Sequence, residues 1–293
     1  MNLTPVRKLA TVACLVFGLS ACESAMPTSS APSASAGPTG SPELAAAIEA
    51  LPESISSSGE LRIATLEDSP PSVYKSMDGN LIGWEIELGQ LLAQRLGLQA
   101  KFVPMEFSKI LPDVASGAVD MGLSSVFDTP SRRMLVDFID YYRTGVTWAA
   151  LTGKEVNPND ACGLTVAVQL GTFEEITDLP VKSVVCGAAG KKPIMIMALP
   201  TQAEVVDAVL LGKADALLGD SPVTVYGVQH SNEQLAVVGQ TYGMTLCGMP
   251  VSKENPELAK ALELALIDLQ NDGTYERVLG KWGVDVGAIP KPA

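Results

Sequence analysis

The sequence predicts an α/β fold with mostly parallel sheets, arranged as two similar lobes with a cleft between them. From residue 61 onward, short apolar runs typical of strands alternate with segments whose apolar residues recur at helical spacing. The same order of strand, turn and helix returns in the second half of the chain, although the two halves are not copies of each other in sequence.

The first half supplies three predicted strands. They span residues 61–65, 101–104 and 120–123. The helix after the first strand carries four leucines on one face between residues 88 and 96, and Gly97 stands at its C-terminal end. We expect Ser108 to cap a short helix before the third strand, because a serine side chain can accept from a free N–H group at a helix start.

The second half supplies three more predicted strands. They span residues 164–168, 194–199 and 214–218. A turn at residues 171–172 leads into a helix that opens with two glutamates, and Thr201 with Glu204 forms a capping box before the next helix. Asn255 and Pro256 begin a long amphipathic helix near the C-terminus.

Residues 1–21 have the pattern of a secretion signal. Arg7 and Lys8 precede an apolar run over residues 9–19, which is too short to span a bilayer because a spanning helix needs about 20 apolar residues. We therefore expect export of the mature chain.

The end of this segment predicts a lipid anchor. Leu19-Ser20-Ala21-Cys22 resembles the bacterial lipobox, in which the cysteine is lipidated and becomes the first residue. Residues 23–42 are almost wholly Ser, Ala, Pro, Thr and Gly, a composition that cannot bury enough surface to fold. Residues 22–42 are thus predicted to tether an extracytoplasmic domain to the cell membrane. An ordinary signal peptide followed by a chance cysteine is the alternative.

Charge and cysteine content exclude other classes. A net charge of −13 argues against a nucleic-acid partner, which requires clustered Lys and Arg. Export permits one disulfide, and Cys162 with Cys186 is the expected pair because these residues enclose a predicted strand, turn and helix. Cys247 would then be a buried free thiol. No spacing resembles a zinc site, and the single histidine, His230, is expected at the surface. We expect no metal and no cofactor.

The strongest local signal for a binding site lies at residues 124–132. Thr129 can cap a helix with Pro130 in its first turn, and Arg132 sits just inside that helix. A guanidinium beside free backbone N–H groups can bind a carboxylate. The alternative is an exposed arginine on a solvated helix.

Several motifs occur in the order typical of one protein family. They include GWEIEL at 83–88, TPSR at 129–132, VQLGT at 168–172, GKADA at 212–216 and the closing stretch 269–282. From about residue 60 to 285 the chain resembles the family 3 solute-binding proteins of ABC importers for polar amino acids. The resemblance implies a bilobal type II periplasmic-binding-protein fold, with two Rossmann-like lobes joined by a two-strand hinge. The implied parts are lobe 1 at 60–148 plus 244–293, lobe 2 at 149–243, and crossings near 147–151 and 242–245.

The same resemblance implies how a ligand is held. Arg132 would bind the α-carboxylate, helped by the Ser125 hydroxyl, the Phe127 backbone N–H and the turn at Thr172. Asp220 would accept from the α-ammonium group, since a buried carboxylate is tolerable where a cation pairs with it.

The resemblance also implies the walls of the cleft. Phe107 would lie over the ligand side chain, and the loop at 67–69, with Asp68, would close one wall. Phe127 and Phe173 stand where the family usually has small hydroxyl residues, which puts the identity of the ligand in doubt.

The implied function is that of an extracytoplasmic substrate-binding component, a monomer that closes on an amino-acid-like ligand and docks on a membrane permease. It is not expected to be an enzyme. A dehydratase-like enzyme on the same scaffold would need a general acid in the cleft, for which Glu106 is the candidate. A sensor or adhesion lipoprotein that has lost transport is the other alternative.

Overall fold

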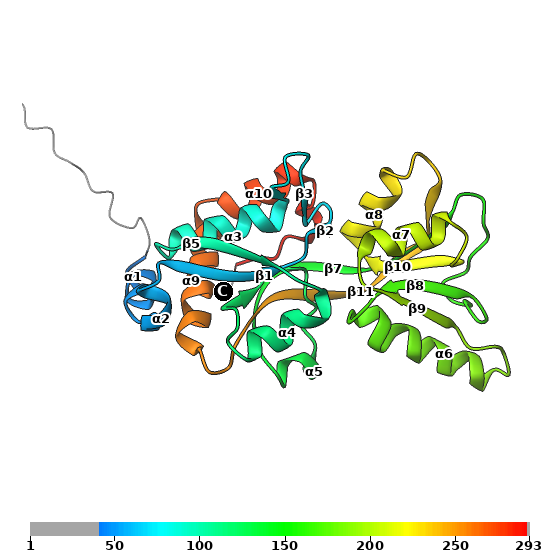
Figure 1. Ribbon diagram of the computed structural model, residues 1–293, viewed down its shortest axis with the longest axis horizontal. Coiled ribbons are helices and arrows are strands. Elements are labelled where there is room, and N and C mark those ends of the chain that lie inside the picture. The colour runs from blue at the N-terminus through cyan, green and yellow to red at the C-terminus, as the bar shows by residue number, and fades with distance from the viewer. Residues whose placement is uncertain (1–40, 292–293) are drawn as a thin grey trace, which may run out of the picture. The chain divides into compact units, whose positions relative to one another are not determined.

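The computed structural model describes residues 41–291, which form a mixed α/β structure (Figure 1). The predicted signal segment and the lipidation site at Cys22 lie outside the described residues. Within residues 41–291 no helix has the length and apolar character that crossing a membrane requires.

One eight-stranded sheet runs through both lobes, in the order β5-β1-β6-β11-β7-β10-β8-β9. Its strands are β1 (Glu60–Thr65), β5 (Gln99–Pro104), β6 (Met121–Gly122), β7 (Asp137–Leu151), β8 (Thr165–Gln169), β9 (Met195–Leu199), β10 (Ala216–Asp220) and β11 (Leu235–Val251). A small second sheet contains β2 (Asp68–Ser69), β3 (Val73–Lys75) and β4 (Leu81–Ile82).

The helices are α1 (Pro42–Glu49), α2 (Glu53–Ser56), α3 (Trp84–Arg95), α4 (Phe107–Ala115), α5 (Pro130–Arg133), α6 (Leu179–Ala188), α7 (Gln202–Leu210), α8 (Ser221–Gln229), α9 (Pro256–Asn271) and α10 (Thr274–Trp282), with a π-helix η1 (Glu174–Asp178) and a short 3-10 helix η2 (Asp285–Gly287). Most of the helices lie against the eight-stranded sheet, whereas α1 packs on another helix, α9.

Each lobe has a parallel core, as predicted. In lobe 1, β1 pairs in parallel with β5 and β6, and in lobe 2, β8 pairs in parallel with β9 and β10. Parallel strands are usually buried on both faces, and the middle of β1 and β8 is accordingly fully buried, as Ile63 and Val168 show. The predicted bilobal fold is confirmed.

Two long antiparallel strands, β7 and β11, join the lobes (Figure 1). The pairing of β7 with β11 is irregular where the two strands pass from one lobe to the other. Between the pairs Trp148–Val238 and Thr144–Thr245, β11 advances seven residues while β7 advances four. Gly239 in this stretch has a φ of 72°, a left-handed conformation that favours glycine. The extra residues of the hinge therefore lie on β11.

Most of the predicted helix caps are present in the structure. Thr201 and Glu204 form the predicted capping box, and the Thr129 hydroxyl accepts from the Arg132 N–H. The predicted Ser108 cap is wrong. The cap residue of α4 is Glu106, where the backbone is extended with a φ of −65° and a ψ of 141°, so Ser108 falls inside the first turn.

Helices α1 and α2 were not predicted. Leu44, Ala47, Leu51 and Ile55 are buried in the core of lobe 1, and α1 contacts α9 (Figure 1). The residues around them are mostly small and polar, so this sparse apolar face is visible only once α9 supplies the surface against which it packs. Residues of α1 and α2 therefore pack with the core of lobe 1, although they precede residue 60.

A disulfide joins Cys162 and Cys186, across 24 positions of the sequence. It ties the start of β8 to the end of α6, inside lobe 2. Cys247 on β11 is buried, and among residues 41–291 it is the free cysteine.

Candidate functional site

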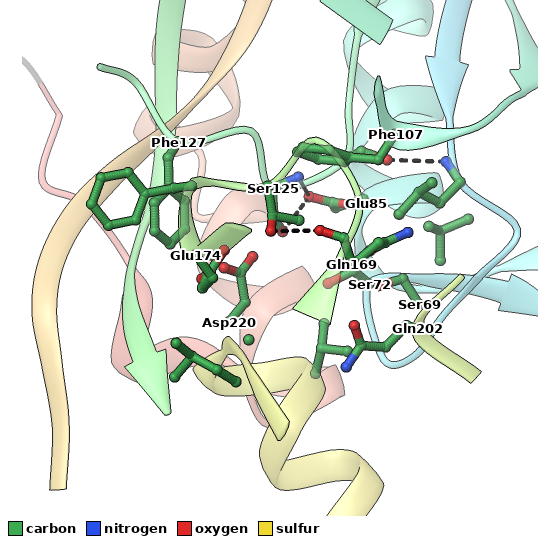
Figure 2. A pocket seen from close by; sticks show the side chains of 18 of the residues that line it. Ser69, Ser72, Glu85, Phe107, Ser125, Phe127, Gln169, Glu174, Gln202 and Asp220 are labelled. Carbon is green, nitrogen blue, oxygen red and sulfur yellow. Dashed lines mark hydrogen bonds between the residues drawn. The ribbon is translucent and has the colours of Figure 1, made fainter. Parts of the chain in front are cut away.

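A pocket lies between the two lobes and is lined by elements of both (Figure 2). The space between protein atoms there is about 530 Å³, part of it open to solvent. Its lining residues are Leu66, Ser69, Ser72, Val73, Glu85, Phe107, Ser124, Ser125, Phe127, Arg132, Gln169, Thr172, Phe173, Glu174, Gln202, Leu218, Gly219, Asp220 and Val223.

Arg132 lines this pocket and is hydrogen-bonded to both lobes. Its guanidinium donates to the Phe127 carbonyl at 2.9 Å and, from the other lobe, to the Gly171 carbonyl at 3.2 Å. Burial lowers the pKa of Arg132, and the nearby acids Glu174 and Asp220 oppose that shift. Because a guanidinium has further N–H groups, Arg132 can still bind a carboxylate.

Asp220 and Glu174 face each other in lobe 2 (Figure 2). Burial raises the pKa of Asp220 well above its usual value, and the nearby carboxyl group of Glu174 adds to the shift. Burial also raises the pKa of Glu174, to about 7. Asp220 precedes α8 without capping it through its side chain, so its carboxyl group is available to the pocket.

Glu85 contributes a third carboxyl group, from the first turn of α3. Its Oε1 accepts from the Ser125 N–H at 2.7 Å, from the Ser125 hydroxyl at 2.9 Å and from the Tyr141 hydroxyl. Ser125 has a φ of 48°, a conformation that costs free energy in a non-glycine residue. Glu85 thus positions the Ser125 loop, and it engages the hydroxyl that was predicted to contact the ligand.

Three phenylalanines form the apolar part of the pocket. The rings of Phe127 in lobe 1 and Phe173 in lobe 2 lie 5.8 Å apart, within the range of favourable aromatic pairs. The guanidinium carbon of Arg132 lies 5.6 Å from the centre of the Phe107 ring. The two residues that depart from the family pattern therefore contact each other across the lobes.

Two predicted residues, Thr172 and Asp68, make other contacts. The Thr172 hydroxyl lines the pocket but donates to the Gln169 carbonyl at 2.7 Å, which closes the turn before η1. Asp68 is not among the described lining residues, although its neighbour Ser69 is. Burial raises the pKa of Asp68, and the nearby Thr201 and Ala203 backbone oppose that shift, because β2 of lobe 1 lies against α7 of lobe 2.

Several polar residues of the pocket were missed as site residues, among them Glu85, Gln169, Glu174 and Gln202. Glu85 and Glu174 had been interpreted only as acidic residues at helix starts, where such residues are common. Both are buried, and an acidic residue placed between apolar core positions is the signal that could have found them.

Three buried polar atoms in the pocket have no hydrogen-bond partner: Glu85 Oε2, Glu174 Oε1 and Gln202 Nε2. Buried polar groups are nearly always paired because leaving one unpaired costs about 1–3 kcal/mol. Their convergence on one pocket therefore indicates a ligand that carries several hydrogen-bonding groups.

Comparison with known proteins identifies the family. The model of the bacterial extracellular solute-binding proteins, family 3, matches residues 61–285. The chain belongs to this family. The arginine-binding protein ArgT of Corynebacterium glutamicum is 37% identical to this family 3 protein over 241 residues, which cover 82% of this chain and 79% of ArgT.

Solved structures of similar proteins agree with the fold. An ancestral arginine-binding protein bound to arginine is 30% identical, with a TM-score of 0.70 over 76% of this chain and 98% of that one. The ancestral amino-acid-binding protein AncCDT-1, a precursor of cyclohexadienyl dehydratase, is 29% identical, with a TM-score of 0.68 over 78% of this family 3 protein and 98% of that chain. The family resemblance read from the sequence is confirmed.

Proposed function

We propose that this protein binds an amino acid with a positively charged side chain, of the arginine class, and delivers it to an ABC importer. The observation that carries the proposal is the charge of the pocket. Among its described lining residues Arg132 is the single cation, whereas Glu85, Glu174 and Asp220 supply three carboxyl groups. Arginine binding by ArgT and by the ancestral protein supports the same ligand class.

The ligand would bridge the lobes. Its α-carboxylate would accept from Arg132 of lobe 1, and its α-ammonium group would donate to Asp220 of lobe 2. Each contact is a charge-assisted hydrogen bond in a buried pocket, where such bonds are strong. Because the two partners belong to different lobes, the ligand stabilises the closed arrangement and shifts the population toward it. The lobe boundaries proposed for this movement are the crossings near 147–151 and 242–245.

The cellular setting is proposed from the sequence. An extracytoplasmic monomer, held by lipid at Cys22 through the tether at 22–42, would present the closed form to a membrane permease. Labelling of intact cells with a radioactive fatty acid tests the anchor. Incorporation should be lost in Cys22→Ala, and a Cys22→Ala chain that still carries the label would contradict the assignment.

Ligand binding is tested on a chain that starts at residue 41. A ligand that binds only the folded state raises the melting temperature by mass action, equivalent to about 2.7 kcal/mol at a hundredfold excess over Kd. L-arginine, L-lysine and L-ornithine should give such shifts. Arg132→Ala should abolish them while the chain still folds.

Arg133→Ala is the matched control. Arg133 is the next residue, forms an ion pair with Asp128 and does not line the pocket, so its removal should leave binding intact. Retained affinity in a folded Arg132→Ala chain would refute the assigned site.

Glu106, the general acid predicted for a dehydratase-like enzyme, does not lie in the pocket. Glu106 is exposed, pairs with Lys109 at 3.1 Å and is absent from the described lining of the pocket. A dehydratase would have to use a carboxyl group that does line the pocket, such as the buried Glu174. We propose that the protein is not an enzyme. Incubation with cyclic hydroxy acids should leave each of them unchanged, and product formation that is lost in Glu174→Gln would overturn this.

A further inference from the structure

Glu174 occupies an unusual position for a carboxyl group. It opens the π-helix η1, a rare element that often occurs at functional sites. The residue is 2% exposed, and its Oε1 has no hydrogen-bond partner. Figure 2 shows its carboxyl group directed toward that of Asp220 inside the pocket.

The contact between Glu174 and Asp220 requires a proton. Two ionised carboxylates that face each other in a buried pocket repel, so one proton stays with the pair, in agreement with the raised pKa of both groups. The charged and titratable groups around this pair are Arg132 on α5, Glu85 on α3, Tyr142 on β7, Asp178 on η1, and Tyr242 and Cys247 on β11. Arg132 is the one cation in that set.

Charge balance distinguishes the possible ligands. The pair with its shared proton carries one negative charge, which Arg132 offsets, and burial raises the pKa of Glu85 and so favours the uncharged form of that third carboxyl group. A ligand with an uncharged side chain is a zwitterion, adds no net charge and leaves the shared proton in place. A ligand with a cationic side chain adds one positive charge, and loss of the shared proton restores the balance.

We propose that Glu174 is the residue that selects a ligand with a positively charged side chain, by releasing the proton it shares with Asp220 when that charge enters the pocket. This rests on the proposed function. In the bound state Asp220 accepts from the α-ammonium group, Glu174 accepts from the side-chain cation through its unpartnered Oε1, and the proton passes to solvent.

The sign of the pH dependence follows. The cation favours the ionised pair, so ligand binding and proton binding compete. Below the pH at which the free pair loses its proton, affinity for a cationic ligand falls by up to about tenfold for each unit that the pH is lowered. A zwitterionic ligand shows no such dependence from this pair.

The test compares L-arginine with L-citrulline, which replaces the guanidinium by an uncharged group of similar shape. Titration calorimetry at about pH 6, in two buffers of different ionisation enthalpy, counts the protons released on binding. The wild-type chain should release about one proton with L-arginine and none with L-citrulline. Glu174→Gln should release none with either and should lose at least about tenfold of its preference for L-arginine.

Glu175→Gln is the matched control, with the same loss of charge one residue away. Its side chain accepts from the Gly171 N–H outside the pocket lining, so proton release and preference should remain. If Glu174→Gln keeps both, the inference is overturned while the proposed function stands. If the wild-type chain binds neither ligand and no other amino acid, the proposed function itself fails, and the inference with it.

Discussion

Replacement of Glu85 tests whether a buried carboxyl group organises the binding loop. In Glu85→Ala the hydrogen bonds to its Oε1 from the Ser125 N–H, the Ser125 hydroxyl and the Tyr141 hydroxyl are all lost. The Ser125 N–H keeps the Tyr141 oxygen as an acceptor at 3.0 Å. Two hydroxyl groups therefore lose their partner.

The magnitude follows from that count. A buried donor without a partner costs about 1–3 kcal/mol, so two of them cost about 2–6 kcal/mol. Ser125 faces the pocket, where water can reach it, so we expect a loss of about 2–4 kcal/mol in the free energy of unfolding. Glu85→Gln should lose under about 1 kcal/mol, because its amide oxygen can accept the same bonds.

The pH dependence of stability distinguishes the carboxyl group of Glu85 from the amide group of the Glu85→Gln variant. Burial raises the pKa of Glu85 above its usual value near 4.5, so the folded state holds a proton that the unfolded state has released. Stability contributed by this group is therefore present below that value and decreases as the pH rises above it. The wild-type chain should lose stability over this window, and Glu85→Gln should lose less.

Urea unfolding followed by circular dichroism at several pH values measures both effects. The wild-type chain, Glu85→Ala and Glu85→Gln are compared at equal protein concentration. If the two variants differ by less than about 1 kcal/mol in the free energy of unfolding, the hydrogen bonds to Glu85 do not carry the stability assigned to them.

Three further substitutions have defined outcomes. Leu44→Ala should lower the free energy of unfolding by about 2–5 kcal/mol in urea, because the side chain is 1% exposed in the lobe 1 core; a loss below about 0.5 kcal/mol would mean that α1 does not pack there. Replacing Cys162 and Cys186 by serine should cost about 3.5 kcal/mol through the 24-residue separation that the disulfide closes, and an unchanged melting temperature would contradict this. Gly171→Ala should weaken amino-acid binding measured by calorimetry, because the new Cβ would lie 2.9 Å from Ser108 of the opposite lobe; undiminished affinity would show that the lobes need not approach so closely.

Features fixed by neighbouring residues could be predicted from the sequence. The capping box of Thr201 and Glu204 depends on residues three apart, and the strands of both lobes depend on short apolar runs. The arginine of the binding pocket was found in the same way, because Thr129 and Pro130 mark the helix start beside it.

Features that depend on residues far apart in the sequence could not be predicted from the sequence. Glu85 and Glu174 lie far apart in the sequence, and each has the appearance of an ordinary acid in a first helical turn. They become parts of one binding pocket only because lobe 1 and lobe 2 bring them together. Helix α1 was missed for a related reason, since Leu44 and Ala47 gain their burial from α9, more than 200 positions later.

The uneven crossing of β7 and β11 has a mechanical consequence. Because β11 uses seven residues where β7 uses four, the connection between the lobes through β11 is longer than the connection through β7. Rotation of the lobes can then be accommodated by changes of backbone conformation in β11 around Gly239, while β7 serves as the axis of the rotation. Rotation about β7 changes the separation between Arg132 in lobe 1 and Asp220 in lobe 2, the two residues proposed to hold the ligand.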